Sequence, residues 1–179
     1  INLKRKAHFR NSKQVKHLKN SFHLLIWRGK LLFRFKDGKP FPYLINQRTK
    51  FIKKLTTYIF LGDFENKNVF LWDMSDSRDV LGNTGQIGSF NDADRNYHPD
   101  LPKGTYFCDL RNLLPVLNSK YANLCATAKG MYEWHKRVNF CQSCGGKLTS
   151  EKAGWEKTCI KCNFKQFPRI DPVVIMLIK

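Results

Sequence analysis

Four cysteines in two identically spaced pairs constrain this sequence more than any other feature. The pairs are Cys141 with Cys144 and Cys159 with Cys162, and fourteen residues separate them. Two cysteines three positions apart on a tight turn can aim both sulfurs at one point, and two such turns at the ends of a hairpin complete a tetrahedron. Gly145 and Gly146 let the backbone fold so that amide groups face the thiolates. We therefore predict a closed, structural Zn²⁺ site with these four cysteines as ligands and no open position for catalysis.

Two other uses of paired cysteines fit this sequence less well. A disulfide framework needs an oxidising compartment, and no secretory signal is present. A redox C-x-x-C motif normally occurs once, beside a βαβ unit. The segment from Cys141 to Cys162 is also too short to hold a core of its own, whereas structural zinc contributes about 10–16 kcal/mol in comparable peptides. Zinc is the interpretation that the spacing favours.

The charge of the chain is strongly one-sided. Its 179 residues include 32 Lys and Arg but 14 Asp and Glu, which gives a formal net charge of +18. Such a balance indicates either a polyanionic partner or acidic residues in a part of the molecule outside this sequence. The 42% hydrophobic content excludes a disordered chain. We expect no membrane partner, since no apolar run is long enough to span a bilayer.

The first segment of the chain is basic and acid-free. Residues 1–36 contain eleven Lys or Arg and no Asp or Glu. Residues 1–20 lack apolar periodicity, so we predict a solvated, flexible basic arm there, with a polyanion-binding arm or a targeting presequence as alternatives. The compartment we expect is cytoplasmic, because the cysteine pattern is that of a reduced protein, and a mitochondrial presequence is the alternative.

The sequence predicts an α+β fold in which a β-rich domain over 21–118 precedes the cysteines. A hairpin is predicted over 22–35 with its turn at Gly29, then strands over 56–61 and 69–72 joined by a polar segment over 62–68, then a long loop over 82–104. Asp109 is a predicted N-cap of a short helix.

A connecting helix over 119–136, capped by Ser119, and a zinc ribbon over 137–166 are predicted to follow. The apolar positions of this helix recur at helical spacing: Leu124, Cys125, Ala128, Met131, and Trp134 or His135. We interpret this stripe as core, with Cys108 and Cys125 as buried thiols.

The lysines of the ribbon allow two interpretations. A ribbon in a basic chain suggests a self-contained nucleic-acid-binding module in which lysines contact phosphates and Phe164 and Phe167 stack on bases. The lysines concerned are Lys147, Lys152, Lys157, Lys161 and Lys165. Alternatively, they offset the dianionic zinc cluster and solubilise a small hairpin.

The residues on either side of the ribbon indicate which kind of zinc-ribbon protein this is. They read Trp134-His135 and Phe140-Cys141 on one side, and Phe167-Pro168-Arg169-Ile170-Asp171-Pro172-Val173-Val174-Ile175-Met176 on the other. From about Phe22 to its end the chain resembles the NADH pyrophosphatase, or NAD(H) diphosphatase, family of Nudix hydrolases. In that family a β-rich domain leads through a helix ending in Trp-His into a four-cysteine zinc ribbon, and an aromatic-Pro-Arg segment opens the catalytic Nudix domain.

The resemblance implies hydrolysis of the pyrophosphate of NADH or NAD⁺ to AMP and a nicotinamide mononucleotide. It also implies a homodimer, NAD-capped RNA as a further substrate, and zinc ligands at Cys141, Cys144, Cys159 and Cys162. The family's aromatic nucleotide contact falls on Phe167, where Tyr is usual. Stacking survives that change, but a phenolic hydrogen bond does not.

The Nudix box, G-x5-E-x7-R-E-x2-E-E-x-G, does not occur in these 179 residues. Its glutamates bind the catalytic Mg²⁺ or Mn²⁺ ions. We therefore expect residues 167–179 to be the start of a truncated Nudix domain, with its first buried strand at 173–178. This chain would contain no catalytic residue and would bind zinc without hydrolysing NADH. An edge strand at a natural C-terminus is the alternative for 173–178.

Overall fold

A computed structural model describes residues 3–11, 15, 18, 20–46, 50–83, 93–169 and 176. It confirms the predicted α+β class, with most of the regular structure in two sheets. The larger sheet has the order β1-β5-β6-β2-β3-β4, with β7 paired to β3; β2 and β6 are parallel, and the other pairs are antiparallel. Its strands are β1 (Leu3–Lys4), β2 (Ser21–Trp27), β3 (Lys30–Lys36), β4 (Lys39–Pro42), β5 (Tyr58–Phe64), β6 (Lys67–Asp73) and β7 (Thr105–Cys108).

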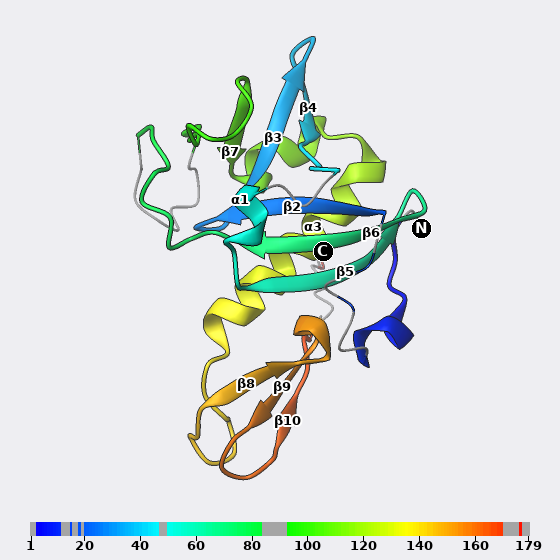
Figure 1. Cartoon of the computed structure of the whole chain (residues 1–179), viewed down its shortest axis with the longest axis vertical. Helices are drawn as coiled ribbons and strands as arrows, with labels where there is room; N and C mark the ends of the chain where they lie inside the picture. The colour runs from blue at the N-terminus through cyan, green and yellow to red at the C-terminus, as the bar shows by residue number, and fades with distance from the viewer. Residues whose placement is uncertain are drawn as a thin grey trace.

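A second, three-stranded antiparallel sheet carries the cysteine pairs and lies at the lower end of the molecule in Figure 1. Its order is β10-β9-β8, with strands β8 (Leu148–Glu151), β9 (Glu156–Cys159) and β10 (Lys165–Gln166). We call residues 137–169, which contain this sheet, the ribbon. The helices are α1 (Lys50–Lys53), α2 (Leu110–Leu113), α3 (Ser119–Arg137), and the 3₁₀ turns η1 (Ala7–Asn11), η3 (Leu114–Val116) and η4 (Lys152–Gly154).

The two predicted strand pairs are present, but the second is longer than predicted. β2 and β3 join at Arg28 and Gly29, with φ of 46° and 86°, as a two-residue hairpin turn requires. β5 and β6 continue through most of the predicted 62–68 connection and turn at Glu65 and Asn66. The connection was predicted wrongly because Gly62 reads as a turn residue. In the structure Gly62 is paired with Val69 beside a bulge, and a Cβ on it would collide with the backbone of Lys4 in β1.

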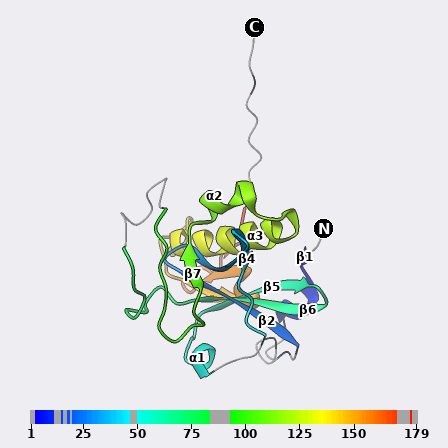
Figure 2. The same cartoon turned by 90° about the horizontal axis from the view of Figure 1, so that it is seen from above.

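Both faces of the larger sheet are buried, which explains the continuous apolar run of β2. One face, with Leu24 and Ile26, packs against α3 through Leu124, Ala128 and Met131. The opposite face, with Leu25, Trp27, Phe60, Phe70 and Trp72, packs against Ile52 of α1 and against Val80 and Leu101. Figure 2 shows α2 and α3 on one side of the sheet and α1 on the other.

Helix α3 confirms the predicted apolar stripe and corrects its cap. Asn118, not Ser119, is the N-cap, and its side chain accepts the hydrogen bond from the Lys120 amide. Tyr132 joins the predicted buried positions. Asp109 caps α2 as predicted. Cys108 and Cys125 are both buried, and burial raises the pKa of Cys125 to about 12, so this thiol stays protonated.

The start of the chain contacts the larger sheet. Within the predicted basic arm, Leu3 and Lys4 pair with β5, and the Lys6 ammonium donates a hydrogen bond to Asp63 at 2.8 Å. Apart from residue 176, the predicted strand over 173–178 lies outside the described residues. No helix in the described ranges has the length and apolarity needed to cross a bilayer.

Candidate metal centre

Two similar turns present the four cysteines from neighbouring segments. In the first, the Gly145 amide donates to the Cys141 carbonyl at 2.8 Å; in the second, the Asn163 amide donates to the Cys159 carbonyl at 3.0 Å. Gly145 and Asn163 both have positive φ, 69° and 57°, which closes each turn after its second cysteine. Glycine and asparagine are the residues that adopt this conformation most readily.

The four sulfurs lie within 4.8 Å of one another. The separations are 3.3 Å for Cys144–Cys162, 3.5 Å for Cys144–Cys159 and 3.7 Å for Cys141–Cys162. A tetrahedral Zn²⁺ with Zn–S bonds of about 2.3 Å requires sulfurs about 3.8 Å apart, whereas a disulfide requires about 2.05 Å. The geometry therefore fits one metal ion such as zinc and no disulfide among these cysteines.

The surroundings of the sulfurs fit anionic thiolates. The amides of Ser143 and Lys161 donate to the sulfurs of Cys141 and Cys159, each at 3.4 Å. Amide hydrogen bonds stabilise thiolates and orient them toward a metal. The position of Gly146 is equally constrained: an added Cβ there would lie 2.9 Å from the Cys159 sulfur and 3.4 Å from that of Cys144. A side chain larger than hydrogen would press into the space that the thiolates share.

The pKa values of Cys159 and Cys162 are shifted in opposite directions. A hydrogen bond from the Cys162 amide, assisted by that of Lys161, lowers the pKa of Cys159 to about 6. At Cys162 the Phe164 amide acts in the lowering direction, but contacts with the other three thiols and burial raise the pKa to about 12. One thiolate forms easily and a further one is opposed, as expected for anions that a divalent cation would neutralise.

The C-terminus of α3 joins the ribbon to the larger sheet. His135 Nε2 lies 2.7 Å from the Gly154 carbonyl, and burial lowers the pKa of His135, so the neutral ring donates this bond. The Lys157 ammonium donates to the carbonyls of His135, at 3.0 Å, and of Val138. The interpretation of Lys157 as a phosphate contact does not fit this position, because its side chain is buried and donates to carbonyls at the negative end of the helix dipole.

Trp155 anchors the ribbon on β5. Its indole Nε1 donates to the Phe60 carbonyl at 2.5 Å, and the Arg10 guanidinium lies 3.7 Å from the ring centroid. The neighbouring Gly154, at φ 94°, lies so close to Ile59 that an added Cβ would meet three of its carbons at 3.0–3.2 Å. Arg10 and Trp155 carried no recognisable signal in the sequence, because the contact joins segments 145 residues apart.

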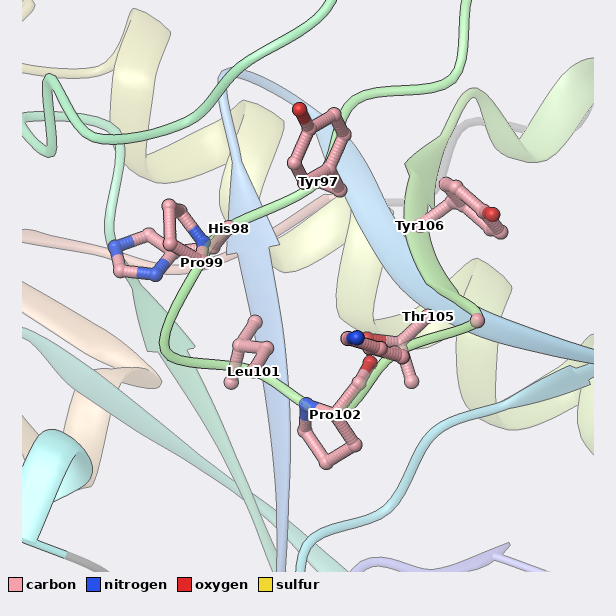
Figure 3. A pocket seen from close by; sticks show the side chains of 9 residues that line it. Tyr97, His98, Pro99, Leu101, Pro102, Thr105 and Tyr106 are labelled. Atoms are coloured by element: carbon pink, nitrogen blue, oxygen red, sulfur yellow. The ribbon is translucent and has the colours of Figure 1, made fainter.

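Phe167 is an exposed residue of the ribbon. Phe167 follows β10 and is 55% exposed, so its ring is accessible. A cavity of about 410 Å³ lies in the loop that leads into β7. Figure 3 shows its lining, including Tyr97, His98, Leu101 and Tyr106. No Asp or Glu belongs to this lining, so it offers no site for a hard cation.

Within the described ranges, the four cysteines are the only group of three or more His, Cys, Asp or Glu residues that could hold an ion. The described part of the chain thus contains one candidate metal site, formed by these cysteines.

Comparison with known proteins gives one family and several relatives. A family model described as an NADH pyrophosphatase-like rudimentary NUDIX domain matches residues 21–134. Human NAD-capped RNA hydrolase NUDT12 is 34% identical over 87 residues, covering 44% of this chain and 17% of the relative. NAD-capped RNA hydrolase NudC of Mycobacterium tuberculosis strain H37Ra is 31% identical over 80 residues, covering 45% and 25%. Chloroplastic Nudix hydrolase 19 of Arabidopsis thaliana is 42% identical over 57 residues, covering 31% and 13%. The matches thus span a quarter or less of these relatives' lengths.

Proposed function

We propose that this chain, which belongs to the family with an NADH pyrophosphatase-like rudimentary NUDIX domain, is the N-terminal and zinc-ribbon portion of an NAD(H) diphosphatase. The whole enzyme would add water across the pyrophosphate of NADH or NAD⁺ and release AMP and a nicotinamide mononucleotide. The observation that carries the proposal is the family match over 21–134, followed directly by the four-cysteine cluster. Two of the relatives are named NAD-capped RNA hydrolases, so we propose NAD-capped RNA as a further substrate.

In this proposal the whole enzyme has two kinds of metal site, a structural one in this chain and a catalytic one in the Nudix domain. Cys141, Cys144, Cys159 and Cys162 would bind one structural Zn²⁺, which supplies the ribbon with the stability that its small core lacks. The catalytic Mg²⁺ or Mn²⁺ would require a Nudix box, and these 179 residues contain none. We therefore expect this chain to be inactive alone.

Phe167 is the residue of this chain that we propose as a nucleotide contact. Its ring is exposed at the end of the ribbon and is free to stack on a base. It lacks the hydroxyl of tyrosine, so we expect stacking without a hydrogen bond. We further propose a homodimer in the cytoplasm.

Two measurements test the proposal. The 179-residue chain should contain about one zinc per molecule by elemental analysis and release no AMP from NADH with Mg²⁺ or Mn²⁺. Extending the reading frame past Lys179 should reveal a carboxylate-rich box within a few dozen residues, and the extended protein should convert NADH to AMP. A stop codon at that point, or an extended protein without hydrolysis, would overturn the proposal.

A self-contained nucleic-acid-binding module is the second candidate function. The exposed lysines and aromatic rings of the ribbon favour it. It would replace the first candidate if the extended protein bound RNA but hydrolysed neither NADH nor capped RNA.

A further inference from the structure

The N-terminal segment over residues 3–11 is bound to the edge of the larger sheet. Leu3 and Lys4 form β1, which pairs antiparallel with β5, and the Leu3 side chain is buried in the core cluster on the α3 face. The Lys6 ammonium donates to Asp63 of β5 at 2.8 Å, and the Asp63 side chain is buried. Breaking such a pair leaves a buried carboxylate without its counter-charge, which is costly. The segment is therefore anchored to β5 by backbone, apolar and charged contacts.

Strand β5 has the residue that this close approach requires. Gly62 has a φ of 134°, and a Cβ on it would collide with the Lys4 carbonyl oxygen and lie 2.9 Å from the Arg5 Cα. Glycine within a strand often marks a place where another backbone comes close. Any side chain at position 62 would push the N-terminal segment away from β5.

Beyond β1 the segment continues as η1 and reaches the ribbon. Phe9 of η1 packs against the core cluster on the opposite face of the sheet, so the segment passes from one face to the other at the edge of β5. The Arg10 guanidinium lies 3.7 Å from the centroid of the Trp155 ring, and that of Arg5 lies 5.5 Å from it. In Figure 1 this blue segment descends past the end of β5 to the level of the orange η4. A cation over an indole face is attracted by the negative charge of the ring's π system.

Trp155 is enclosed between β5 and the N-terminal segment. Its indole Nε1 donates to the Phe60 carbonyl, and Arg10 covers the ring. Burial lowers the pKa of Arg10 to about 10, so the guanidinium stays charged at neutral pH. The Lys152 ammonium of η4 adds an exposed hydrogen bond to Asn11 at 2.7 Å. The same short segment thus contacts the sheet at one end and the ribbon at the other.

We propose that residues 3–11 form a strap that holds the ribbon against the larger sheet. A free polyanion-binding arm, or a presequence that is removed, would leave Asp63 without the Lys6 ammonium and the Trp155 ring without its cover. The strap precedes residues 21–134, which the family model matches, so the match does not describe it. The position of the ribbon, and of the residues that follow it, depends on this segment. The proposal concerns docking within this chain and does not rest on the proposed function.

The test measures the hydrogen-exchange rate of the Trp155 indole N–H in the ¹⁵N-labelled 179-residue chain. This proton exchanges when the indole leaves the Phe60 carbonyl, so its rate reports undocking of the ribbon. Arg10→Gln should raise the rate about tenfold, as expected for a partly desolvated cation–π contact. Lys6→Gln removes a contact of the strap with the sheet and none with Trp155. It should still raise the rate, by about threefold or more, because a strap transmits the loss of either anchor.

Two controls separate undocking from general effects. The Trp72 indole N–H donates to His23 inside the sheet and is the internal reference, whose rate should stay constant in every variant. Lys4→Gln is the matched variant, because it removes one positive charge from the same segment at an exposed side chain. It should change neither indole rate.

The proposal makes the effect of Lys6→Gln the decisive result. Faster exchange with Arg10→Gln alone would show that Arg10 is a local cover and that no strap exists. Equal acceleration of both indoles would show that the whole sheet opens, and equal effects of Lys4→Gln and Arg10→Gln would show a response to net charge. Each of these results, or an unchanged Trp155 rate in all variants, would overturn the strap.

Discussion

At the scale of single residues, Gly146 is a position of the metal site where the structure leaves no room for a side chain. A methyl group there would lie 2.9 Å from the Cys159 sulfur, closer than nonbonded contacts permit. We predict that Gly146→Ala displaces a ligand and loses zinc to a chromophoric chelator at least tenfold faster than the wild type. Gly130→Ala in α3 is the control, because its Cβ would meet nothing within 4 Å; it should retain zinc and gain about 1 kcal/mol of stability. Equal zinc retention by both variants would contradict the assignment.

His135 should make folding sensitive to acid. Burial lowers its pKa in the folded state, with Lys157 acting in the same direction and Asp73 and the Gly154 carbonyl opposing. A base whose pKa is lowered on folding takes up its proton in the unfolded state first, so stability is present above the ordinary value near 6.5 and falls as the pH decreases below it. We predict that His135→Gln reduces this slope, by at most about 1.4 kcal/mol per pH unit, in urea titrations between pH 7 and 5. Parallel curves for the two proteins would refute it.

At the scale of elements, the turn η4 connects the ribbon to the larger sheet through Trp155. The indole is 9% exposed, donates to the Phe60 carbonyl and stacks under Arg10. We predict that Trp155→Ala costs about 3–5 kcal/mol of unfolding free energy, as for other large buried side chains. Urea denaturation followed by far-UV circular dichroism measures it. Lys152→Ala, which removes only an exposed bond to Asn11, should cost less than about 0.5 kcal/mol.

Elements with local signals could be predicted from the sequence, and elements that depend on distant partners could not. The hairpin at Gly29 and the stripe of α3 follow from periodicity and turn chemistry, and both are present. β1 is only two residues long and forms by pairing with the edge of β5, so no sequence pattern predicts it. Lys157 appeared to be a surface lysine because composition does not reveal that carbonyls at a helix end lie beside it.

At the scale of the whole molecule, the sequence predicted the metal site more completely than it predicted the strand pairing of the larger sheet. The C-x2-C spacing predicted that four sulfurs converge, and the structure brings them within 4.8 Å. The parallel pairing of β2 with β6 joins segments more than 40 residues apart, and neither strand specifies it alone.

The distribution of buried side chains predicts how the molecule responds to loss of metal. Among the described residues, the two core clusters of the larger sheet include Trp155 and Ala153 of the ribbon and no other ribbon side chain. The remaining apolar side chains that the ribbon buries are those of Cys141 and Cys159. Zinc binding of about 10–16 kcal/mol would therefore be the main stabilising term for β8, β9 and β10 alone. We predict that excess chelator collapses the amide resonances of residues 139–166 to random-coil positions in ¹⁵N-correlation spectra and leaves those of β2, β3, β5 and β6 dispersed. Re-addition of one equivalent of Zn²⁺ should restore the spectrum, whereas Mg²⁺ should not, since thiolates are poor ligands for a hard cation. Retention of dispersed ribbon resonances in metal-free protein would show that the ribbon is held by its docking on α3 and β5, and that the four cysteines do not carry its fold.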